Sequence, residues 1–88
     1  MDSWSLDRVT LDSSLSRFHS TQPDSSTLRS LYDWIMDLLS GPLSGSREDP
    51  EYPGIFTGRV PRTNVDVTFV LDLVDRVIHI TDISESVP

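Results

Sequence analysis

The chain has 88 residues, with fourteen acidic against seven basic side chains, a formal net charge of −7 and no cysteine. This size predicts a single domain over residues 1–88 with a small core, and the lack of cysteine excludes disulfides and thiolate metal sites. A negative surface repels phosphate backbones, which argues against autonomous nucleic-acid binding unless the arginines gather on one face.

Neither a membrane span nor an export signal is visible in the sequence. No stretch approaches the ~20 apolar residues that a spanning helix needs, and the first residues combine no basic start with an apolar run. A cytoplasmic protein without a membrane partner is therefore expected. All seven basic residues are Arg, which we interpret as a coding bias, the alternative being selection for bidentate contacts.

The first half of the chain predicts one strand and two helices. Apolar residues alternate with polar ones around Trp4 and Leu6, which indicates a first strand within residues 1–10. Residues 11–42 predict a helical hairpin, because one apolar stripe precedes a break at Pro23 and a longer stripe follows it. The second helix has Asp24, Ser25 or Ser26 as its expected N-cap, Gly41 as a left-handed C-cap, and apolar residues at Leu28, Leu31, Tyr32, Ile35, Leu38 and Leu39.

The second half predicts a loop followed by strands. Residues 43–54 contain Gly and Pro with mixed charge and are expected to form a loop, and residues 84–88 a tail. Antiparallel strands are expected over residues 55–83, ending in a β-hairpin with a charged, solvated turn. The expected fold is α+β, a two-helix hairpin packed on a small antiparallel sheet in the order β-α-α-β-β-β. By alternation, the hairpin buries Val65, Val67, Phe69, Leu71, Ile78 and Ile80, with Val77, His79, Thr81 and Ile83 on the opposite face.

Several features occur in the same order as in a known family. They are the opening strand with Trp4 and Leu6, a helix that closes Asp-Leu-Leu-Ser-Gly-Pro (37–42), an Arg-Val pair (59–60), and the block from Thr68 to Ile83. In architecture and hydrophobic rhythm the chain resembles the RelE/ParE superfamily of toxins from bacterial and archaeal toxin–antitoxin modules. The resemblance covers nearly the whole chain and implies a RelE/ParE-like fold, with a cognate antitoxin as partner and no cofactor.

The residues that ribonuclease members of this superfamily use for chemistry are missing. Those members place an Arg three residues before the aromatic of the third strand, where this chain has Asp66, and basic residues after the last strand, where it has none. Cleavage of RNA through its 2′-hydroxyl needs a base, a cation and an acid. The groups left for these roles are Arg59, Arg62, Arg76, His79, Tyr52 and His19, and Arg59, Arg62 and His79 are kept as catalytic candidates.

Each candidate also has a structural interpretation. Arg59 and Arg62 form a local basic cluster and are partner-binding candidates, or else they balance Asp residues on neighbouring strands. His79 is a general-base candidate or a polar residue on the outward face of a strand. Trp34 covers the flank of the core or anchors a partner. The acidic residues of the C-terminal third lack the spacing of a calcium loop, so no metal site is expected at Asp72, Asp75, Asp82 and Glu85.

Two functions remain open. The first is a divergent, degenerate RelE/ParE-like toxin that inhibits either translation, by ribosome-dependent mRNA cleavage, or DNA gyrase. Whether it is an enzyme is left open, because the nuclease residues are missing. The alternative is a non-enzymatic acidic interaction module, of the immunity or inhibitor type, that binds a basic partner by charge complementarity.

Overall fold

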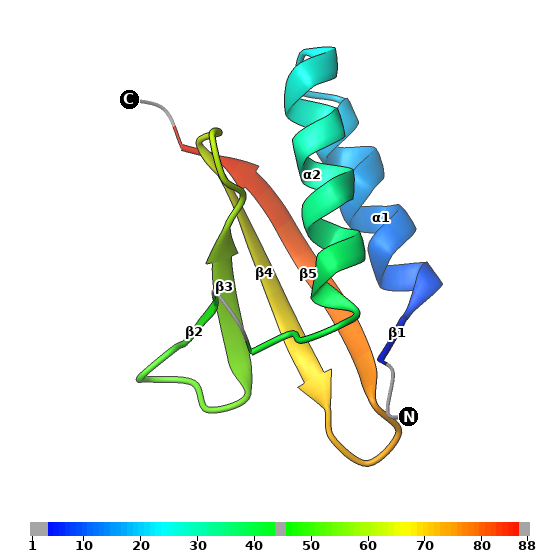
Figure 1. Ribbon diagram of the computed structural model, residues 1–88, viewed down its shortest axis with the longest axis vertical. Helices are drawn as coiled ribbons and strands as arrows, with labels where there is room; N and C mark the ends of the chain where they lie inside the picture. Colours follow the sequence, from blue (N-terminus) through cyan, green and yellow to red (C-terminus); the bar gives the residue numbers. More distant parts are fainter. Residues whose placement is uncertain (1–3, 44–45, 87–88) are drawn as a thin grey trace.

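Two helices and a five-stranded sheet make up the part of the chain that is described, residues 4–43 and 46–86 of a computed structural model (Figure 1). The fold is therefore α+β, as the sequence predicts. Neither described helix has the length and apolar composition needed to cross a membrane. The elements in chain order are β1 (Ser5–Leu6), α1 (Arg8–His19), α2 (Ser25–Leu38), β2 (Ser46–Glu48), β3 (Ile55–Arg59), β4 (Val65–Asp72) and β5 (Val77–Glu85).

The sheet is mixed, which corrects the expectation of an antiparallel one. Its strand order is β1-β5-β4-β3-β2. Strands β2 to β5 pair antiparallel, whereas β1 runs parallel to β5, with Ser5 opposite Val77 and Leu6 opposite Ile78. Such a short strand has no pairing signal of its own, since two residues cannot show a period.

The segment expected as a loop, residues 43–54, contains the edge strand β2, so this expectation was wrong in part. β2 pairs with β3 through Ser46–Gly58, Arg47–Thr57 and Glu48–Phe56. The connection back to β3 is closed by the Asp49 amide, which donates to the Ile55 carbonyl at 2.8 Å. Strand β2 carries no apolar alternation because it lies at the edge of the sheet and buries no side chain.

The hairpin of β4 and β5 is confirmed, with one change of face. Val65, Val67 and Phe69 are fully buried, as are Ile78 and Ile80. A bulge then interrupts the register, because Thr68 pairs with Asp82 while Phe69 pairs with Ile80. The extra residue reverses the alternation. Ile83 consequently faces the core at 6% exposure, and its predicted place on the outer face was wrong.

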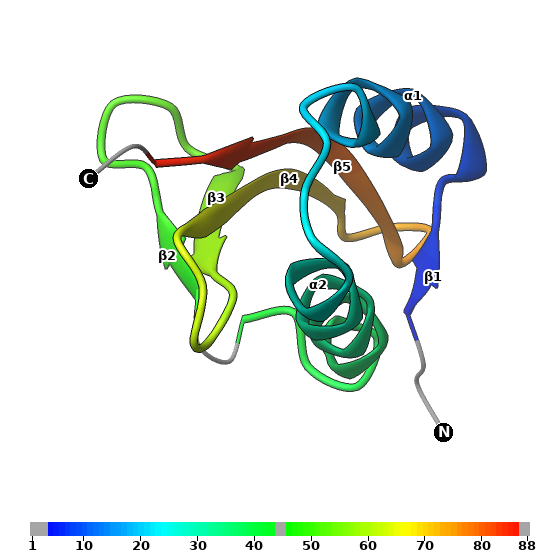
Figure 2. The same ribbon diagram turned by 90° about the horizontal axis from the view of Figure 1, so that it is seen from above.

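Both helices pack on the sheet, as expected: α2 lies across one face, and α1 lies along the edge of β5 with its Phe18 buried in the same core. Seen from above, the sheet curves around α2 (Figure 2). Leu31, Ile35 and Leu38 of α2 are buried in one cluster with the inward residues of β4 and β5. Asp24 is the N-cap, as predicted, and its side chain accepts from the Thr27 amide. The predicted left-handed C-cap at Gly41 is absent, since Gly54 is the described glycine with a positive φ.

Helix α1 runs along the edge of β5 that β1 leaves uncovered. Ser14 is 1% exposed, and its hydroxyl donates to the Ile80 carbonyl at 2.8 Å. One turn later, the Arg17 guanidinium donates to the Thr81 carbonyl at 2.9 Å. Side chains of α1 thus take the place of a neighbouring strand, which protects an edge that would otherwise be open to pairing.

Three predicted boundaries need correction. Helix α1 begins at Arg8 with Asp7 as its N-cap, so residues 8–10 are helical rather than part of a first strand. Helix α2 ends at Leu38, before the predicted end of the helical hairpin at residue 42. Strand β5 continues to Glu85 and takes up two residues of the expected tail. Residues 1–3, 44–45 and 87–88 of the predicted segments lie outside the described residues.

Replacing Ser14 by Ala tests whether α1 seals the edge of β5. The Ser14→Ala change leaves the buried Ile80 carbonyl without its donor, so the free energy of unfolding should fall by about 1–3 kcal/mol. Ser16→Ala is the matched control, because Ser16 is exposed on the same helix, and it should change stability by less than ~0.5 kcal/mol. Urea unfolding followed by circular dichroism measures both. Equal stability of the two variants would contradict this role for Ser14.

Candidate functional site

The face of the sheet opposite α2 carries mostly polar side chains. Along β4, Asp66 and Thr68 alternate with the buried Val65, Val67 and Phe69 and therefore point away from the core. The register places Arg59 beside Asp66 and Thr57 beside Thr68. On the other side, Asp66 pairs with Ser84 and Thr68 with Asp82. We call this surface the outer face.

A bidentate ion pair occupies one row of the outer face. Arg59 Nε donates to Asp66 Oδ1 at 2.8 Å, and a terminal nitrogen of its guanidinium donates to Oδ2 at 3.2 Å. The Ser86 hydroxyl donates to the same Oδ2 at 3.0 Å. These hydrogen bonds, foremost that from Arg59, lower the pKa of Asp66, and Asp66 raises the pKa of Arg59. The carboxylate thus occupies the Nε edge of the guanidinium, one of the two edges with which Arg59 could hold a phosphate.

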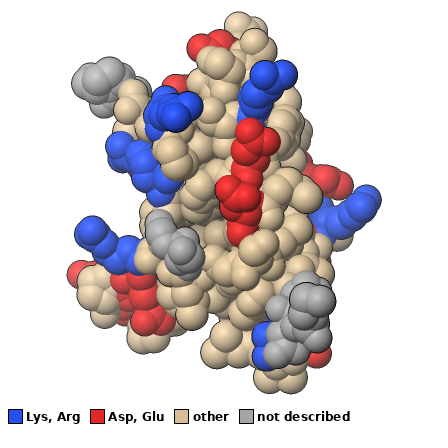
Figure 3. All heavy atoms as spheres, in the orientation of Figure 1, with Lys and Arg blue, Asp and Glu red and all other residues tan. Residues whose placement is uncertain are grey.

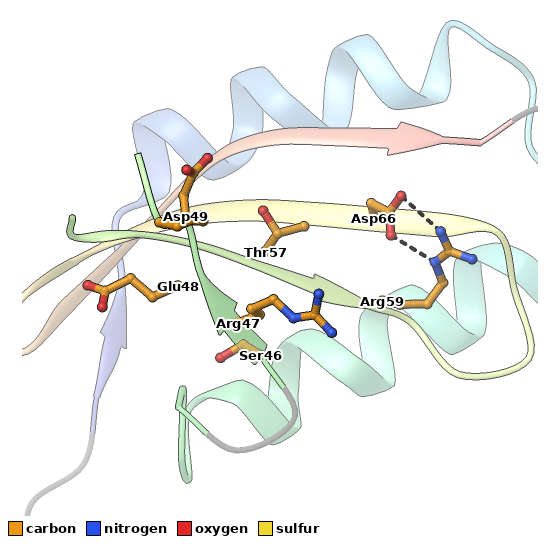
Figure 4. A pocket seen from close by; sticks show the side chains of 8 residues that line it. Ser46, Arg47, Glu48, Asp49, Thr57, Arg59 and Asp66 are labelled. Atoms are coloured by element: carbon orange, nitrogen blue, oxygen red, sulfur yellow. Dashed lines mark hydrogen bonds and ion pairs between the residues drawn. The ribbon is translucent and has the colours of Figure 1, made fainter. Parts of the chain in front are cut away.

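Beside this pair lies the outer groove, a hollow with a volume of about 640 Å³. Figure 4 shows Arg47 of β2 extending toward Arg59 on β3, while Glu48 points the other way. No described residue gives Arg47 a hydrogen bond or ion pair. The outer groove therefore presents one guanidinium that is available and one that is engaged. Its lining comprises Ser46, Arg47, Glu48, Asp49, Pro50, Thr57, Arg59 and Asp66.

The sequence neighbours Arg59 and Arg62 do not act together. Arg62 follows the end of β3 in a left-handed conformation, with φ 65°. It lines a separate hollow of about 230 Å³ that also contains Trp34, Asp33 and Asp37 of α2. The expected basic cluster is thus divided between two sites. Of the partner-binding candidates, Trp34 and Arg62 come together, and Arg59 lies elsewhere.

His79 lies on the outer face at the far end from Arg59. Its Nδ1 is 3.6 Å from Oδ2 of Asp7, the N-cap of α1. The pKa of Asp7 is lowered, chiefly by the hydrogen bond from the Thr10 amide, with a smaller contribution from His79. Arg59 and His79 stand two strands apart, ~10 Å, and their rows are separated by four residues of β4, a further ~13 Å. Arg59 directs its guanidinium to Asp66 and His79 has its ring beside Asp7, so the two side chains do not converge on one point.

The other chemistry-bearing residues are distributed over separate elements. The His19 ring shares a hydrogen bond of 2.9 Å with the Tyr32 hydroxyl and links the two helices. Arg76, at the β4–β5 turn, places its guanidinium carbon 5.9 Å from the centre of the Trp4 ring. Tyr52 is exposed in the β2–β3 connection. Within residues 4–43 and 46–86, no three His, Asp or Glu side chains are grouped in a way that could hold a metal ion.

For Arg59 the structure confirms the structural alternative, that it balances an Asp on a neighbouring strand, although the sequence did not show that this residue is Asp66. Asp66 was noted only because it stands where ribonuclease members have Arg. A signal was present, because Arg59 and Asp66 flank the short turn between β3 and β4 and must face each other once those strands pair. Arg47 was missed because its strand was not predicted.

Comparison with known proteins gives no relative: no family model, curated protein or solved structure matches this chain. Interpretation of the site therefore rests on its residues and on the resemblance described above.

Removing Arg59 should raise the pKa of Asp66. In the Arg59→Gln variant the carboxyl should titrate at a higher pH than in the native protein, because the largest cause of its lowered pKa is removed. Arg62→Gln removes the same charge without touching Asp66 and should leave its pKa unchanged. The carbon resonance of the Asp66 carboxyl, followed by NMR against pH, measures both. An identical titration in Arg59→Gln and native protein would contradict the ion pair.

The lowered pKa of Asp66 also determines how the stability of the protein changes with pH. Because the folded-state pKa lies below the unfolded one, the ion pair stabilises the protein above about pH 4, and this contribution is lost as the pH falls through the folded value. Asp66→Asn should therefore be less stable than the native protein at neutral pH. In acid, where the native ion pair is lost, the two proteins should be equally stable.

Proposed function

We propose that this protein is a RelE/ParE-like member of a toxin–antitoxin module that acts by binding a protein target, as in the gyrase-inhibiting branch, and not by cleaving RNA. A cognate antitoxin would cover its helices and a sheet edge. The proposal joins the family resemblance of the sequence to the state of the outer face. It assigns no catalytic role to Arg59, Arg62 or His79.

The arrangement of the elements supports the family assignment. A short strand leads into two consecutive helices, and the chain then returns through three antiparallel strands, β3 to β5. This is the order that the resemblance implies. β2 is an addition to it, and the parallel pairing of β1 with β5 closes the sheet on the side of the helices.

The observation that carries the binding mode is the ion pair between Arg59 and Asp66. Ribonuclease chemistry needs cations that are free to stabilise a phosphorane and a base within reach of the 2′-hydroxyl. Here a carboxylate occupies the Nε edge of the Arg59 guanidinium, and the backbone of His79 lies ~16 Å away by strand geometry. The neighbouring outer-face positions carry Thr68, Asp82 and Ser84. A surface of this kind is poorly suited to an RNA backbone.

Induction of the protein in a bacterial host separates the possible activities. We expect growth arrest with intact mRNA and with altered supercoiling of a reporter plasmid. The Arg59→Ala and His79→Ala variants should arrest growth to the same extent as the native protein. Primer extension on a co-expressed message and chloroquine gels of the plasmid provide the two measurements.

Two results would overturn this proposal. Cleaved mRNA that becomes intact in Arg59→Ala or His79→Ala would establish a ribonuclease. Unimpeded growth with unchanged supercoiling, at protein levels verified by immunoblot, would remove the toxin assignment altogether.

A second candidate, an acidic interaction module, is favoured by the surface over α2. Acidic side chains run down the middle of this face in the space-filling view (Figure 3). Asp33 and Asp37 are exposed there, and the whole chain carries a net charge of −7. Such a surface complements a strongly basic protein.

Capture of partners from the source cell distinguishes the two candidates. An acidic module should retain a strongly basic enzyme whose binding is lost when the salt is raised to about 0.5 M, because exposed charges are then screened. A toxin should retain a small protein encoded by the adjacent gene, and this complex should survive the same wash. Identification by mass spectrometry decides between them.

A further inference from the structure

We propose that the α2 hollow, formed around Trp34 with Asp33 and Asp37, docks a partner segment that presents two basic side chains. This inference rests on the proposed function only in its premise that the protein acts by binding another protein, which the acidic-module candidate shares. It concerns the side of the molecule opposite the outer groove.

Trp34 lines two hollows on this side. One, of about 230 Å³, is lined by Ser30, Asp33, Trp34, Asp37, Pro61 and Arg62. The other, of about 220 Å³, is lined by Trp34, Asp37, Leu38 and Gly41. Trp34 and Asp37 line both hollows.

The indole of Trp34 is fixed on one side and accessible on the other. Its ring meets Phe69 edge-on at 6.3 Å between centres, and it packs against the core. The rest of the side chain is half-exposed along the hollows. No described residue accepts a hydrogen bond from its indole N–H. Because no described side-chain nitrogen is buried without a partner, this N–H is accessible from outside. A rigid, partly exposed aromatic of this kind is a frequent anchor in protein interfaces.

The two carboxylates are placed against the local rules of helix stability. Asp33 and Asp37 stand four residues apart, where like charges repel along a helix. Asp37 also lies in the last turn of α2, which contains no basic residue and where the helix dipole disfavours negative charge. Neither carboxylate has a hydrogen bond or ion pair with any described residue. Arg29 stands four residues before Asp33 and offsets part of this cost, but Asp37 has no such neighbour on α2. A locally unfavourable choice of this kind is typical of functional positions.

The net negative charge of its lining favours a positively charged ligand in the α2 hollow. Arg62 contributes one positive charge to the lining, against two negative charges from Asp33 and Asp37. Since residues four apart on a helix stand about 6 Å apart, the segment should present two cations at that spacing. One of them can also lie over the Trp34 ring. The chain already uses this contact within itself, where Arg76 covers Trp4.

A peptide titration observed by NMR tests the α2 hollow directly. The probe is acetyl-Arg-Ala-Arg-amide, and acetyl-Glu-Ala-Glu-amide is its charge-reversed control. The chain contains two Trp, so its two indole N–H signals can be followed separately. We expect the basic peptide to shift the Trp34 signal saturably and the Trp4 signal little. The acidic peptide should shift neither.

Matched charge variants show whether the position of the carboxylates matters. Asp33→Asn/Asp37→Asn should weaken peptide binding about fivefold, in line with the loss of two exposed ion pairs. Asp75→Asn/Asp82→Asn removes the same charge from exposed positions away from α2 and should leave the affinity within twofold. The α2 double variant should retain or increase its urea midpoint, because the substitutions remove like-charge repulsion.

Three outcomes would overturn the proposal: no saturable shift at Trp34, equal weakening by both double variants, or binding of the acidic peptide through Arg62. Growth arrest and supercoiling are measured independently of this titration. A failed titration with growth arrest rejects the docking site alone, and a positive titration without growth arrest rejects the toxin assignment alone.

Discussion

The fold depends on how the backbone hydrogen-bonding groups along the second edge of β5, the one away from β4, find their partners. On one side β4 supplies a continuous ladder, interrupted by a single bulge. On the other side β1 pairs with two residues, and then Ser14 and Arg17 of α1 donate to the carbonyls of Ile80 and Thr81. Because the strand is covered along this edge, the open edge of the described sheet lies at β2. This arrangement commits α1 to the edge and leaves α2 to cover the face.

The sequence predicted those parts of the fold whose apolar period was long enough to be read. Fourteen residues of α2 and eight of β4 repeat their buried positions several times, so their type and inward face could be assigned. β1 and β2 have two and three residues, too few for any period. The bulge beside Thr81 could not be foreseen, because it is a property of the pairing between two strands and reverses the face of Ile83 without changing the composition.

The candidate site was harder to predict than the fold, because residues that are close in the sequence lie on different sides of the molecule. Arg59 ends β3 and turns to the outer face, whereas Arg62, three residues on, follows a left-handed turn to the α2 side. Conversely, Asp66 and Arg59 are seven residues apart and share two hydrogen bonds. Residue types alone indicated which groups could bind, and strand register determined which of them meet.

The two faces of the molecule therefore present different chemistry. The outer face holds its principal guanidinium in an ion pair, and the α2 face exposes carboxylates beside an aromatic ring. The ion pair on the outer face disfavours phosphate binding there. The carboxylates on the α2 face favour binding of a basic protein segment. Both features agree with a protein that works by binding other proteins.

The central claim, that the outer face does not hold an RNA backbone, can be measured without assuming a target. A short 2′-O-methyl RNA, which cannot be cleaved through its 2′-hydroxyl, is titrated into labelled protein at low salt while the Arg side-chain Nε–H signals are recorded. We predict no saturable shift at Arg47 or Arg59. Saturable shifts at both residues, together with a rise in the pKa of Asp66, would contradict the account and favour a ribonuclease.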